Sequence, residues 1–273
     1  MDRINKKKAV QALFAAFKER ESQGLLLDES KNYFEGSCDR WGVVITQIIN
    51  NIVEDKGRIL DIGSWDGLFC SGFIKLGFSA SAIDWVMDED KVGDPPLGKA
   101  IWQQLGIEWR FCQIEADPIP FPDNSFDGVY MGQVLEHFTY SPRKPVEEIK
   151  RVLKPGGILV VDVPNVGEWH NFYRLLRGKN ILYDYKMHYI DIDKEPVFYK
   201  GLPYFKRHNR EFTPDDLKVL AETCGFEVVR VKYERSIRTG KKGFRRLEVP
   251  FSALRDLIPL FRKCVMLTAR KPV

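Results

Sequence analysis

A glycine turn that follows a short apolar strand is the first feature of this sequence that could bind a ligand. It reads RILDIGSWDGLF over residues 58–69. In a dinucleotide-binding turn, the middle glycine allows the backbone to approach a pyrophosphate. Trp65 occupies that position here, and its bulk disfavours a pyrophosphate. We therefore expect a ligand without phosphate in this turn, contacted by Asp61, Gly63, Ser64, Trp65 and Gly67.

A second candidate ligand contact lies at the end of the next strand, where Asp84 is followed by Trp85. An acidic residue at this place in a nucleotide-binding sheet accepts hydrogen bonds from both ribose hydroxyls. Asp84 comes 17 residues after Gly67, which is about the distance expected for such an acid. Trp85 can stack on an adenine ring. Together with the phosphate-free turn, the pair indicates a ligand that contains adenosine.

Segments with strand character alternate with segments of helical periodicity along most of the chain. The predicted strands cover residues 58–62, 79–84, 107–114, 126–131, 158–163, 226–233 and 263–270. The predicted helices cover residues 6–20, 40–54, 67–77, 99–106, 145–157, 213–225 and 251–261. This alternation predicts an α/β fold with a seven-stranded, mostly parallel sheet and helices on both faces. The last strand should insert antiparallel, and ligands should bind beyond the carboxyl ends of the parallel strands.

Four segments within residues 58–165 carry a family resemblance: RILDIGSWDG, AID, IEADPIPFPDNSFDGVYMGQVLEHF and LKPGGILVVDVPN. In combination they resemble the class I S-adenosylmethionine-dependent methyltransferases with small-molecule acceptors, which have a Rossmann-like fold. The resemblance implies S-adenosylmethionine as cofactor and S-adenosylhomocysteine as product. It implies that the adenine is contacted by Glu115 and Ala116. It also implies that the methionine part of the cofactor lies beside Met131, Gly132 and Gln133. Trp65 and Ile114 depart from the family pattern, which favours glycine at both positions.

Residues 165–212 interrupt the alternation and are predicted to form a cap on the substrate side of the sheet. A long segment without clear periodicity is often a functional lid. Its aromatic residues are Trp169, Phe172, Tyr173, Tyr183, Tyr185, Tyr189, Tyr199, Tyr204 and Phe205. The other predicted parts are N-terminal helices that close over the cofactor (1–54), a core that binds it (55–164) and a C-terminal completion of the sheet (213–273). Tyr33 and Arg40 of the first part are candidates to contact the cofactor's carboxylate.

Several acceptor chemistries do not fit the residues after the fourth and fifth strands. In the family that this chain resembles, enzymes that methylate amino groups of bases have an NPPY-type signature after the fourth strand, whereas this chain has YMGQVLEH there. Methylation of pyrimidine carbon 5 needs a cysteine nucleophile, and no cysteine follows either strand. Catechol-type enzymes hold magnesium through an acid after the fourth strand, where this chain has Met131 and Gly132. They also use an adjacent Asp-Asn pair after the fifth strand, but Asp162 and Asn165 are separated, so no metal site is expected.

Direct methyl transfer to a hydroxyl needs a group that accepts one proton, and His137 is the first candidate. It lies in VLEHF just after the fourth strand, and histidine is suited to this task near neutral pH. Asp162, at the end of the fifth strand, could orient the imidazole, which is similar to an arrangement in sugar O-methyltransferases of natural-product pathways. The same Glu-His pair is also common as a structural element. His188 and His208 in the cap are the alternative bases.

The acceptor is predicted to be a hydroxyl of a sugar, a nucleotide-sugar or a related anionic small molecule. Residues 138–273 contain 28 Lys and Arg against 16 Asp and Glu, whereas residues 1–137 contain 14 against 22, so the second half could face an anion. The run RHNREFTP also resembles methyltransferases of polysaccharide and lipopolysaccharide assembly. Two alternatives stay open: methylation of a quinone or lipid phenol, and a module that binds the cofactor without turnover, which Trp65 would favour.

Composition limits the class of protein. The chain of 273 residues is 44% hydrophobic and has no apolar run near the ~20 residues that span a bilayer. It also lacks the apolar segment of a secretion signal, so we expect a soluble cytoplasmic protein. The five cysteines are scattered without a C-x-x-C pair, which indicates neither a zinc site nor a disulfide framework. Dispersed basic residues disfavour a nucleic-acid substrate, and the oligomeric state is not indicated.

Overall fold

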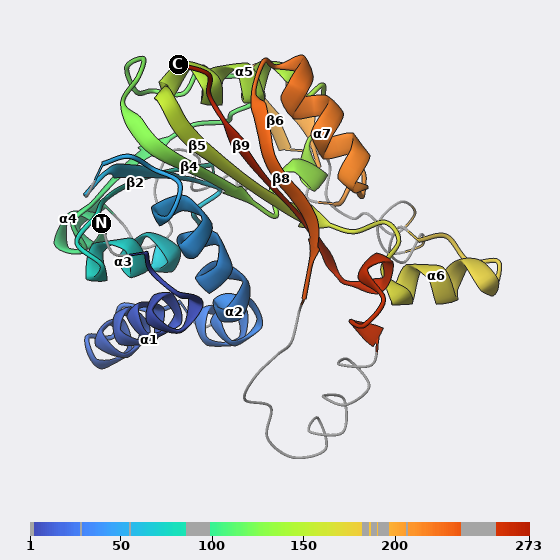
Figure 1. Cartoon of the computed structure of the whole chain (residues 1–273), viewed down its shortest axis with the longest axis horizontal. Helices are drawn as coiled ribbons and strands as arrows, with labels where there is room; N and C mark the ends of the chain where they lie inside the picture. Colours follow the sequence, from blue (N-terminus) through green and yellow to red (C-terminus); the bar gives the residue numbers. More distant parts are fainter. Residues whose placement is uncertain are drawn as a thin grey trace.

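The computed structural model of the chain describes residues 3–85, 99–181, 197–235 and 255–273, apart from 28, 55 and 206, together with 186 and 190. Its centre is a seven-stranded sheet with the strand order β3-β2-β1-β4-β5-β9-β8 (Figure 1). The strands of this sheet are β1 (Arg58–Ile62), β2 (Ser79–Asp84), β3 (Ile107–Phe111), β4 (Phe126–Gly132), β5 (Leu153–Pro164), β8 (Glu227–Glu234) and β9 (Cys264–Arg270). The predicted sheet is therefore confirmed.

Every pairing among β1 to β5 is parallel, and β9 is antiparallel to both of its neighbours. This agrees with the prediction that the last strand inserts antiparallel. Burial explains the parallel part, because β4 and most of β5 are covered on both faces and consist almost entirely of apolar residues. The carboxyl ends of β1, β2, β4 and β5 consequently meet at one edge of the sheet, where a ligand is expected.

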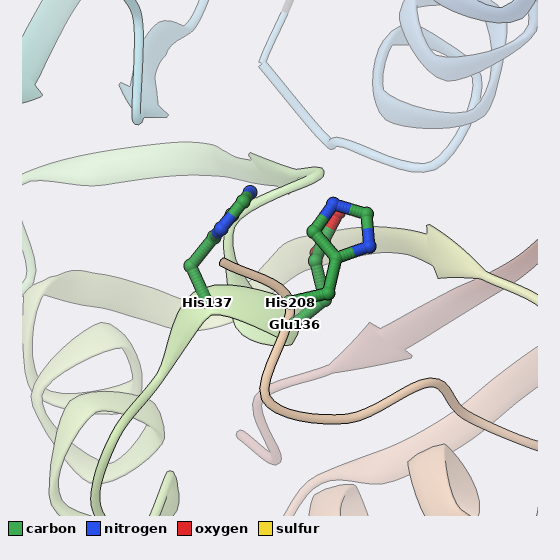
Figure 2. A group of neighbouring side chains, drawn as sticks. All are labelled: Glu136, His137 and His208. Carbon is green, nitrogen blue, oxygen red and sulfur yellow. The ribbon is translucent and has the colours of Figure 1, made fainter. Parts of the chain in front are cut away.

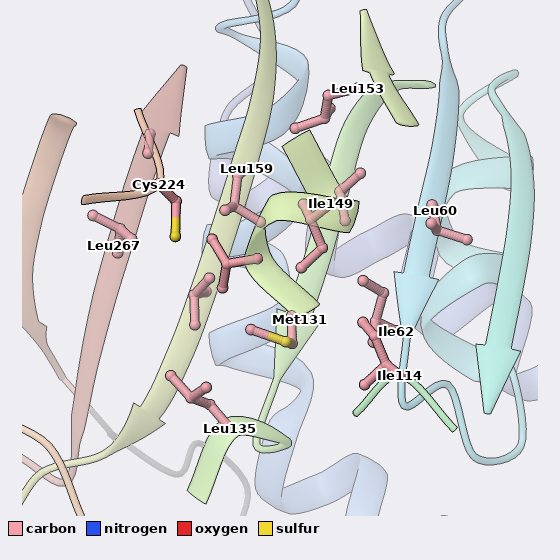
Figure 3. Packing of buried hydrophobic residues seen from close by; sticks show 14 of the residues in the cluster. Leu60, Ile62, Ile114, Met131, Leu135, Ile149, Leu153, Leu159, Cys224 and Leu267 are labelled. Atoms are coloured by element: carbon pink, nitrogen blue, oxygen red, sulfur yellow. The ribbon is translucent and has the colours of Figure 1, made fainter. Parts of the chain in front are cut away.

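Helices cover both faces of the sheet, and each face has its own apolar core (Figure 1). One face carries α1 (Lys6–Ser22), α2 (Ser30–Ile49) and α3 (Leu68–Lys75). The other face carries α5 (Arg143–Val152) and α7 (Pro214–Thr223). Figure 3 shows the second core, in which Ile149 of α5 lies over Met131 and Leu159 of the central strands. Among the described residues, no helix is both long and apolar enough to cross a bilayer.

The remaining elements lie at the edges of the sheet. They are α4 (Lys99–Gln104), α6 (Trp169–Leu176), the hairpin strands β6 (Val197–Tyr199) and β7 (Leu202–Tyr204), and the short 3-10 helices η2 (Leu135–His137) and η5 (Pro259–Phe261). The predicted cap thus contains a helix and a small antiparallel hairpin. Tyr183, Tyr185, His188 and Tyr189 of the cap lie outside the described residues. All five cysteines are buried, as expected for small core residues.

Helix α2 differs most from the prediction. It begins at Ser30 rather than at residue 40 and ends at Ile49 rather than at residue 54. Its first half is polar, and seven residues between Asn32 and Arg40 line a cavity. Apolar periodicity cannot show a helix whose exposed turns face a cavity instead of a core.

Other boundaries also differ from the prediction, most of them by one or two residues, and three differences are larger. Helix α5 ends at Val152 because Leu153 already pairs with Phe126 of β4, so the Lys-Pro-Gly-Gly segment belongs to the start of β5. Strand β3 ends at Phe111, and the residues that follow line a cavity. Of the helix predicted over 251–261, residues 251–254 lie outside the described part, and the rest contains η5.

Candidate active site

The glycine turn between β1 and α3 has three residues in the left-handed region of the backbone. Gly63 and Gly67 have φ of 75° and 71°, and Trp65 between them has φ of 47°. A Cβ atom on Gly63 would lie 2.3 Å from Cγ2 of Val134, so no larger residue fits there. The amide group of Trp65 donates a hydrogen bond of 2.5 Å to Oδ2 of Asp84. The turn is therefore fixed to the end of β2.

The turn is also attached to the N-terminal helices. The ring of Trp65 contacts the ring of Tyr33 in an edge-on arrangement, with centroids 5.2 Å apart. Asp66, which is buried, accepts a hydrogen bond of 2.6 Å from Ser30 and lies 3.9 Å from the buried Arg20 guanidinium. The bulky residue in the turn thus packs against α2.

A first cavity of about 340 Å³ lies beyond the ends of β1 and β2. Its volume falls in the ordinary range for small-molecule sites. Apolar and aromatic side chains form most of its wall, and a few polar groups converge on it. The lining residues among those predicted to bind a ligand are Gly63, Asp84, Trp85, Glu115, Gln133 and His137. The shape and polarity of this cavity suit an adenosine group.

Two carboxyl groups at this edge have perturbed ionisation. Burial raises the pKa of Asp84 to about 6, although the amide groups of Trp65 and Trp85 stabilise its charge. Burial also raises the pKa of Asp61 well above its usual range, and the nearby charge of Asp84 adds to the effect. Asp84 faces the cavity, whereas Asp61 is 3% exposed and lies behind it. Asp84 is therefore the carboxyl group of the two that lines the cavity.

A second cavity of about 550 Å³ lies between α2, the end of β5 and the loop that precedes α7. Tyr33, Arg40 and His208, all predicted as site residues, line it. Most of its other lining side chains are polar or charged: Asn32, Glu35, Ser37, Asp39, Gln133, Glu136, His137, Asn165, Glu168, Glu211, Glu234, Arg235 and Lys263. This cavity has the size and the hydrogen-bonding groups of a site for a polar substrate.

Gln133 and His137 line both cavities and therefore lie at the boundary between them. Gln133 has φ of 56°, which turns the chain sharply after β4. His137 ends η2, and its Nδ1 atom lies 3.2 Å from the carbonyl oxygen of Arg207. Because a carbonyl only accepts, this contact favours the tautomer with the proton on Nδ1. The Nε2 atom is then the nitrogen that can accept a proton or bind a ligand.

The loop that carries His208 is fastened to η2 through Asn209. The backbone amide group of Asn209 donates a hydrogen bond of 2.7 Å to the carbonyl oxygen of Glu136. The side-chain amide group of Asn209 donates to the carbonyl oxygens of His137 and Phe138 at 3.0 and 3.2 Å. The rings of His137 and His208 lie edge to face with centroids 4.7 Å apart. Figure 2 shows both imidazoles and the carboxyl group of Glu136 rising to the same side of η2.

Asp162 has other partners than the one predicted for it. We expected it to orient His137. Instead, its buried carboxylate pairs with the guanidinium of Arg40 and accepts hydrogen bonds from Tyr130 at 2.5 Å and Gln133 at 2.8 Å. The negative charge of Asp162 raises the pKa of Arg40 well above its usual range, against the effect of burial. Asp162 therefore joins α2 to the sheet and positions Gln133.

The other predicted residues divide into two groups. Gly67, Trp65 and Ser64 shape the glycine turn, and neither cavity includes their side chains. Asp61, Ala116, Met131, Gly132 and Asp162 also lie outside the walls of both cavities. Met131 is fully buried in the apolar core, so its side chain does not contact a ligand in the cavities as predicted. The alternation along β4 directs it to the core face.

Three residues of the site were missed in the sequence. Tyr130 supports Asp162 from below, Glu136 lies beside the two histidines, and Asn209 fastens the loop. Glu136 stood in the quoted motif VLEHF, so a buried acid next to the histidine was visible. The contacts of Tyr130 and Asn209 depend on chain segments far apart in sequence and left no local signal.

A family model described as a methyltransferase domain matches residues 39–231 of this chain. The chain is 30% identical over 141 residues to the demethylmenaquinone methyltransferase of Paenarthrobacter aurescens. It is 34% identical over 143 residues to the ubiquinone/menaquinone biosynthesis C-methyltransferase of Methylococcus capsulatus. Each match covers 50% of this chain and 51% of the relative, so the chain spans about half the length of these curated relatives.

Solved structures show the same fold at low sequence identity. A Haloferax volcanii methyltransferase solved with the Trm112 methyltransferase activator has a TM-score of 0.58 and 12% identity, over 96% of this chain and 98% of that one. The Burkholderia thailandensis 1,6-didemethyltoxoflavin-N1-methyltransferase, solved with bound 1,6-didemethyltoxoflavin and S-adenosylhomocysteine, has a TM-score of 0.54 and 16% identity. That match covers 100% of this chain and 93% of the other.

Proposed function

The chain belongs to the methyltransferase domain family, and on that premise we propose that it methylates a hydroxyl oxygen of a polar, hydroxyl-rich small molecule such as a sugar. It is a class I S-adenosylmethionine-dependent methyltransferase, with S-adenosylmethionine as its cofactor. The observation that carries the proposal is the pair of cavities that meet at Gln133 and His137. One suits the adenosine of the cofactor, and the other is a polar chamber for an acceptor.

The first cavity fits the cofactor on physical grounds. Asp84 supplies a carboxylate for the ribose hydroxyls, and Trp85 supplies a ring for the adenine. Gly63 has no side chain that would fill this part of the cavity or collide with Val134. Glu115 accepts a hydrogen bond from the amide group of Tyr140 and also faces the cavity. These residues would hold the adenosine part, in agreement with the roles proposed for them from sequence.

The lining of the second cavity favours a neutral acceptor over the anionic one that the basic half of the chain had suggested. Its walls contain six carboxyl groups against three basic side chains, and one of these, Arg40, is already paired with Asp162. Burial raises the pKa of Glu136 to about 8 and of Glu211 to about 7. Such carboxyl groups can both donate and accept near neutral pH, which matches the hydroxyls of an uncharged sugar.

The reaction needs alignment and the removal of one proton. When bound, S-adenosylmethionine supplies a methyl group on a positively charged sulfur; the carbon–sulfur bond breaks with its electron pair left on sulfur as the acceptor oxygen forms a carbon–oxygen bond. His137 lies where the cavities meet, and Nε2 of its imidazole would take the hydroxyl proton. The carbonyl oxygen of Arg207 holds the imidazole in the tautomer that permits this.

A second candidate function is methylation of a quinone ring carbon. It is favoured by the two relatives named above, which are quinone methyltransferases at 30% and 34% identity over half of this chain. The polar walls around Arg40, Glu136 and Glu168 speak against an apolar ring in the second cavity.

The two candidates are separated by an assay of S-adenosylhomocysteine release. The purified chain is given S-adenosylmethionine and, in turn, neutral sugars, nucleotide-sugars and a reduced demethylquinone. We expect release with a hydroxylated, uncharged acceptor and a loss of at least about 100-fold in kcat for His137→Gln, since a positioned proton acceptor contributes roughly that much. His170→Gln is the matched control, because His170 is exposed on α6.

Release with the demethylquinone alone would replace the proposal by the second candidate. Tight binding of S-adenosylmethionine without release for any acceptor class would favour a module that binds the cofactor without turnover. Full activity of His137→Gln would remove His137 as the proton acceptor.

A further inference from the structure

Glu136, His137 and His208 form a compact cluster on the wall of the second cavity. One ligand atom from each, a carboxylate oxygen and two imidazole nitrogens, lies within 4.8 Å of the other two. Glu136 and His137 are neighbours on η2, and His208 comes from a loop about 70 residues later (Figure 2). The cluster therefore exists only because the cap loop folds back onto the end of β4.

Glu136 is the group that the fold leaves unexplained. It is 1% exposed, and neither of its carboxylate oxygens has a hydrogen-bond partner in the described part of the chain. A buried carboxyl group without partners costs several kcal/mol, and buried polar groups are nearly always satisfied. The backbone of Glu136, by contrast, is bonded, because its carbonyl oxygen accepts from the backbone amide group of Asn209. A cation held beside the carboxylate would satisfy it.

The imidazole of His137 is held as the rings of metal ligands usually are. The contact between Nδ1 of His137 and the carbonyl oxygen of Arg207 favours the proton on Nδ1, which makes Nε2 the ligand atom, and such outer hydrogen bonds commonly fix the rings of metal ligands. The Asn209 side chain holds the loop of His208 at a set distance from η2. The cluster is thus built by several independent contacts.

We propose that Glu136, His137 and His208 bind a divalent transition metal ion such as Zn²⁺ or Mn²⁺ in the second cavity. Two nitrogen ligands and one oxygen ligand favour such ions over Mg²⁺ and Ca²⁺, which prefer oxygen. Three protein ligands leave coordination positions open for a substrate. Ligand bonds of about 2.1 Å require the ligand atoms to be within roughly 4.2 Å of one another, which small side-chain rotations achieve.

The role of the ion rests on the proposed function, whereas its binding does not. An ion at this place would coordinate the acceptor hydroxyl and lower its pKa, so that the hydroxyl proton passes to water before the oxygen takes the methyl group. With the ion bound, His137 is a ligand; without it, His137 is the proton acceptor of the proposed function. The proposed metal site differs from the expectation, drawn from the residues after the fourth and fifth strands, that the chain has none.

Binding is tested on the full chain after treatment with EDTA and dialysis, without any acceptor. Calorimetry with Zn²⁺ should give one site per chain, and Co²⁺ should give a visible absorption band typical of nitrogen and oxygen ligands. Glu136→Gln and His208→Gln should each weaken Zn²⁺ binding at least about 10-fold and abolish the Co²⁺ band. His170→Gln, on the exposed face of α6, should bind as the wild type does.

Absence of saturable Zn²⁺ binding by the wild type would overturn the proposal. Unchanged binding by Glu136→Gln would do the same, provided that this variant still binds S-adenosylhomocysteine and melts as the wild type does. A failure of the proposed function looks different: Zn²⁺ binds as expected, but no hydroxylated acceptor leads to release of S-adenosylhomocysteine.

Discussion

Trp65 is the residue at which local preference and the fold disagree most clearly. A non-glycine residue at φ of 47° costs on the order of 1 kcal/mol, because the left-handed region crowds its Cβ atom. The contact with Tyr33 and the hydrogen bond that the backbone amide group of Trp65 donates to Asp84 offset this cost. Trp65 therefore packs α2 against the glycine turn, whereas Gly63 of the same turn lines the first cavity.

Asp84 should make cofactor binding depend on pH. Its pKa is raised to about 6, so the carboxylate that we propose accepts from the ribose is lost below that pH. We expect the affinity for S-adenosylhomocysteine to rise about 10-fold or more between pH 5 and pH 7 and then level off, which titration calorimetry measures. Asp84→Asn should bind about 10- to 100-fold more weakly at pH 7 and show little pH dependence.

The same raised pKa has the opposite sign for folding. Because the folded chain holds the proton of Asp84 more tightly than the unfolded chain, this residue favours folding most below pH 3.8, and that contribution is lost as the pH rises through about 6. Glu227→Gln, an exposed change on β8, is the control for general charge effects. If the free energy of unfolding of Asp84→Asn depended on pH as that of the wild type does, the raised pKa of Asp84 would not be the cause of that dependence.

The starts of helices α2 and α7 are specified in different ways, one by tertiary contacts and the other by neighbouring residues. The start of α7 is specified locally: Thr213 accepts from the amide group of Asp216, whose carboxylate in turn accepts from Thr213, and Pro214 follows the cap. The start of α2 has no side-chain cap, and its first turns face the second cavity. Its position is set by Asp66 and Trp65 of the glycine turn.

The cap of α7 predicts a local cost. Thr213→Ala removes the oxygen that accepts from the amide group of Asp216, so the free energy of unfolding should fall by about 1 kcal/mol in urea denaturation. Thr213→Ser keeps the hydroxyl and should stay within about 0.5 kcal/mol of the wild type. Equal losses in both variants would mean that the methyl group, rather than the cap, is what matters.

The N-terminal helices, the sheet and the cap loop together enclose the two cavities, and no one of them makes a site alone. Arg40 crosses from α2 to Asp162 of β5, and Asn209 crosses from the cap loop to η2. We expect S-adenosylhomocysteine to slow amide hydrogen exchange in residues 30–40 and 207–212 as the helices close over the cofactor. Amides of α5, on the far face, are the internal control. Protection confined to the glycine turn would contradict this closure.

The buried pair of Arg40 and Asp162 should have a large effect on global stability. Arg40→Met leaves a carboxylate that is 0% exposed without its cation, which costs about 3–5 kcal/mol when one partner of a buried pair is removed. Adding Asp162→Asn should recover part of that loss, since no unpaired charge then remains buried. Lys18→Met, in an exposed pair with Glu21, should change the free energy of unfolding by less than about 1 kcal/mol. A double variant less stable than Arg40→Met would show that Asp162 matters for its hydrogen bonds rather than its charge.

The sequence by itself determined the seven-stranded, mostly parallel sheet, the antiparallel last strand, and the residues Gly63, Asp84 and Trp85 that line the first cavity, because strand ends and glycine turns are encoded by neighbouring residues. Only the tertiary structure decided where the polar start of α2 lies, which residues Asp162 pairs with, and that His208 reaches Glu136 and His137. These depend on segments far apart in the chain, 36 residues for Ser30 and Asp66 and 122 for Arg40 and Asp162. Their side chains meet through packing of the helices and the cap loop on the sheet and leave no periodic or local trace.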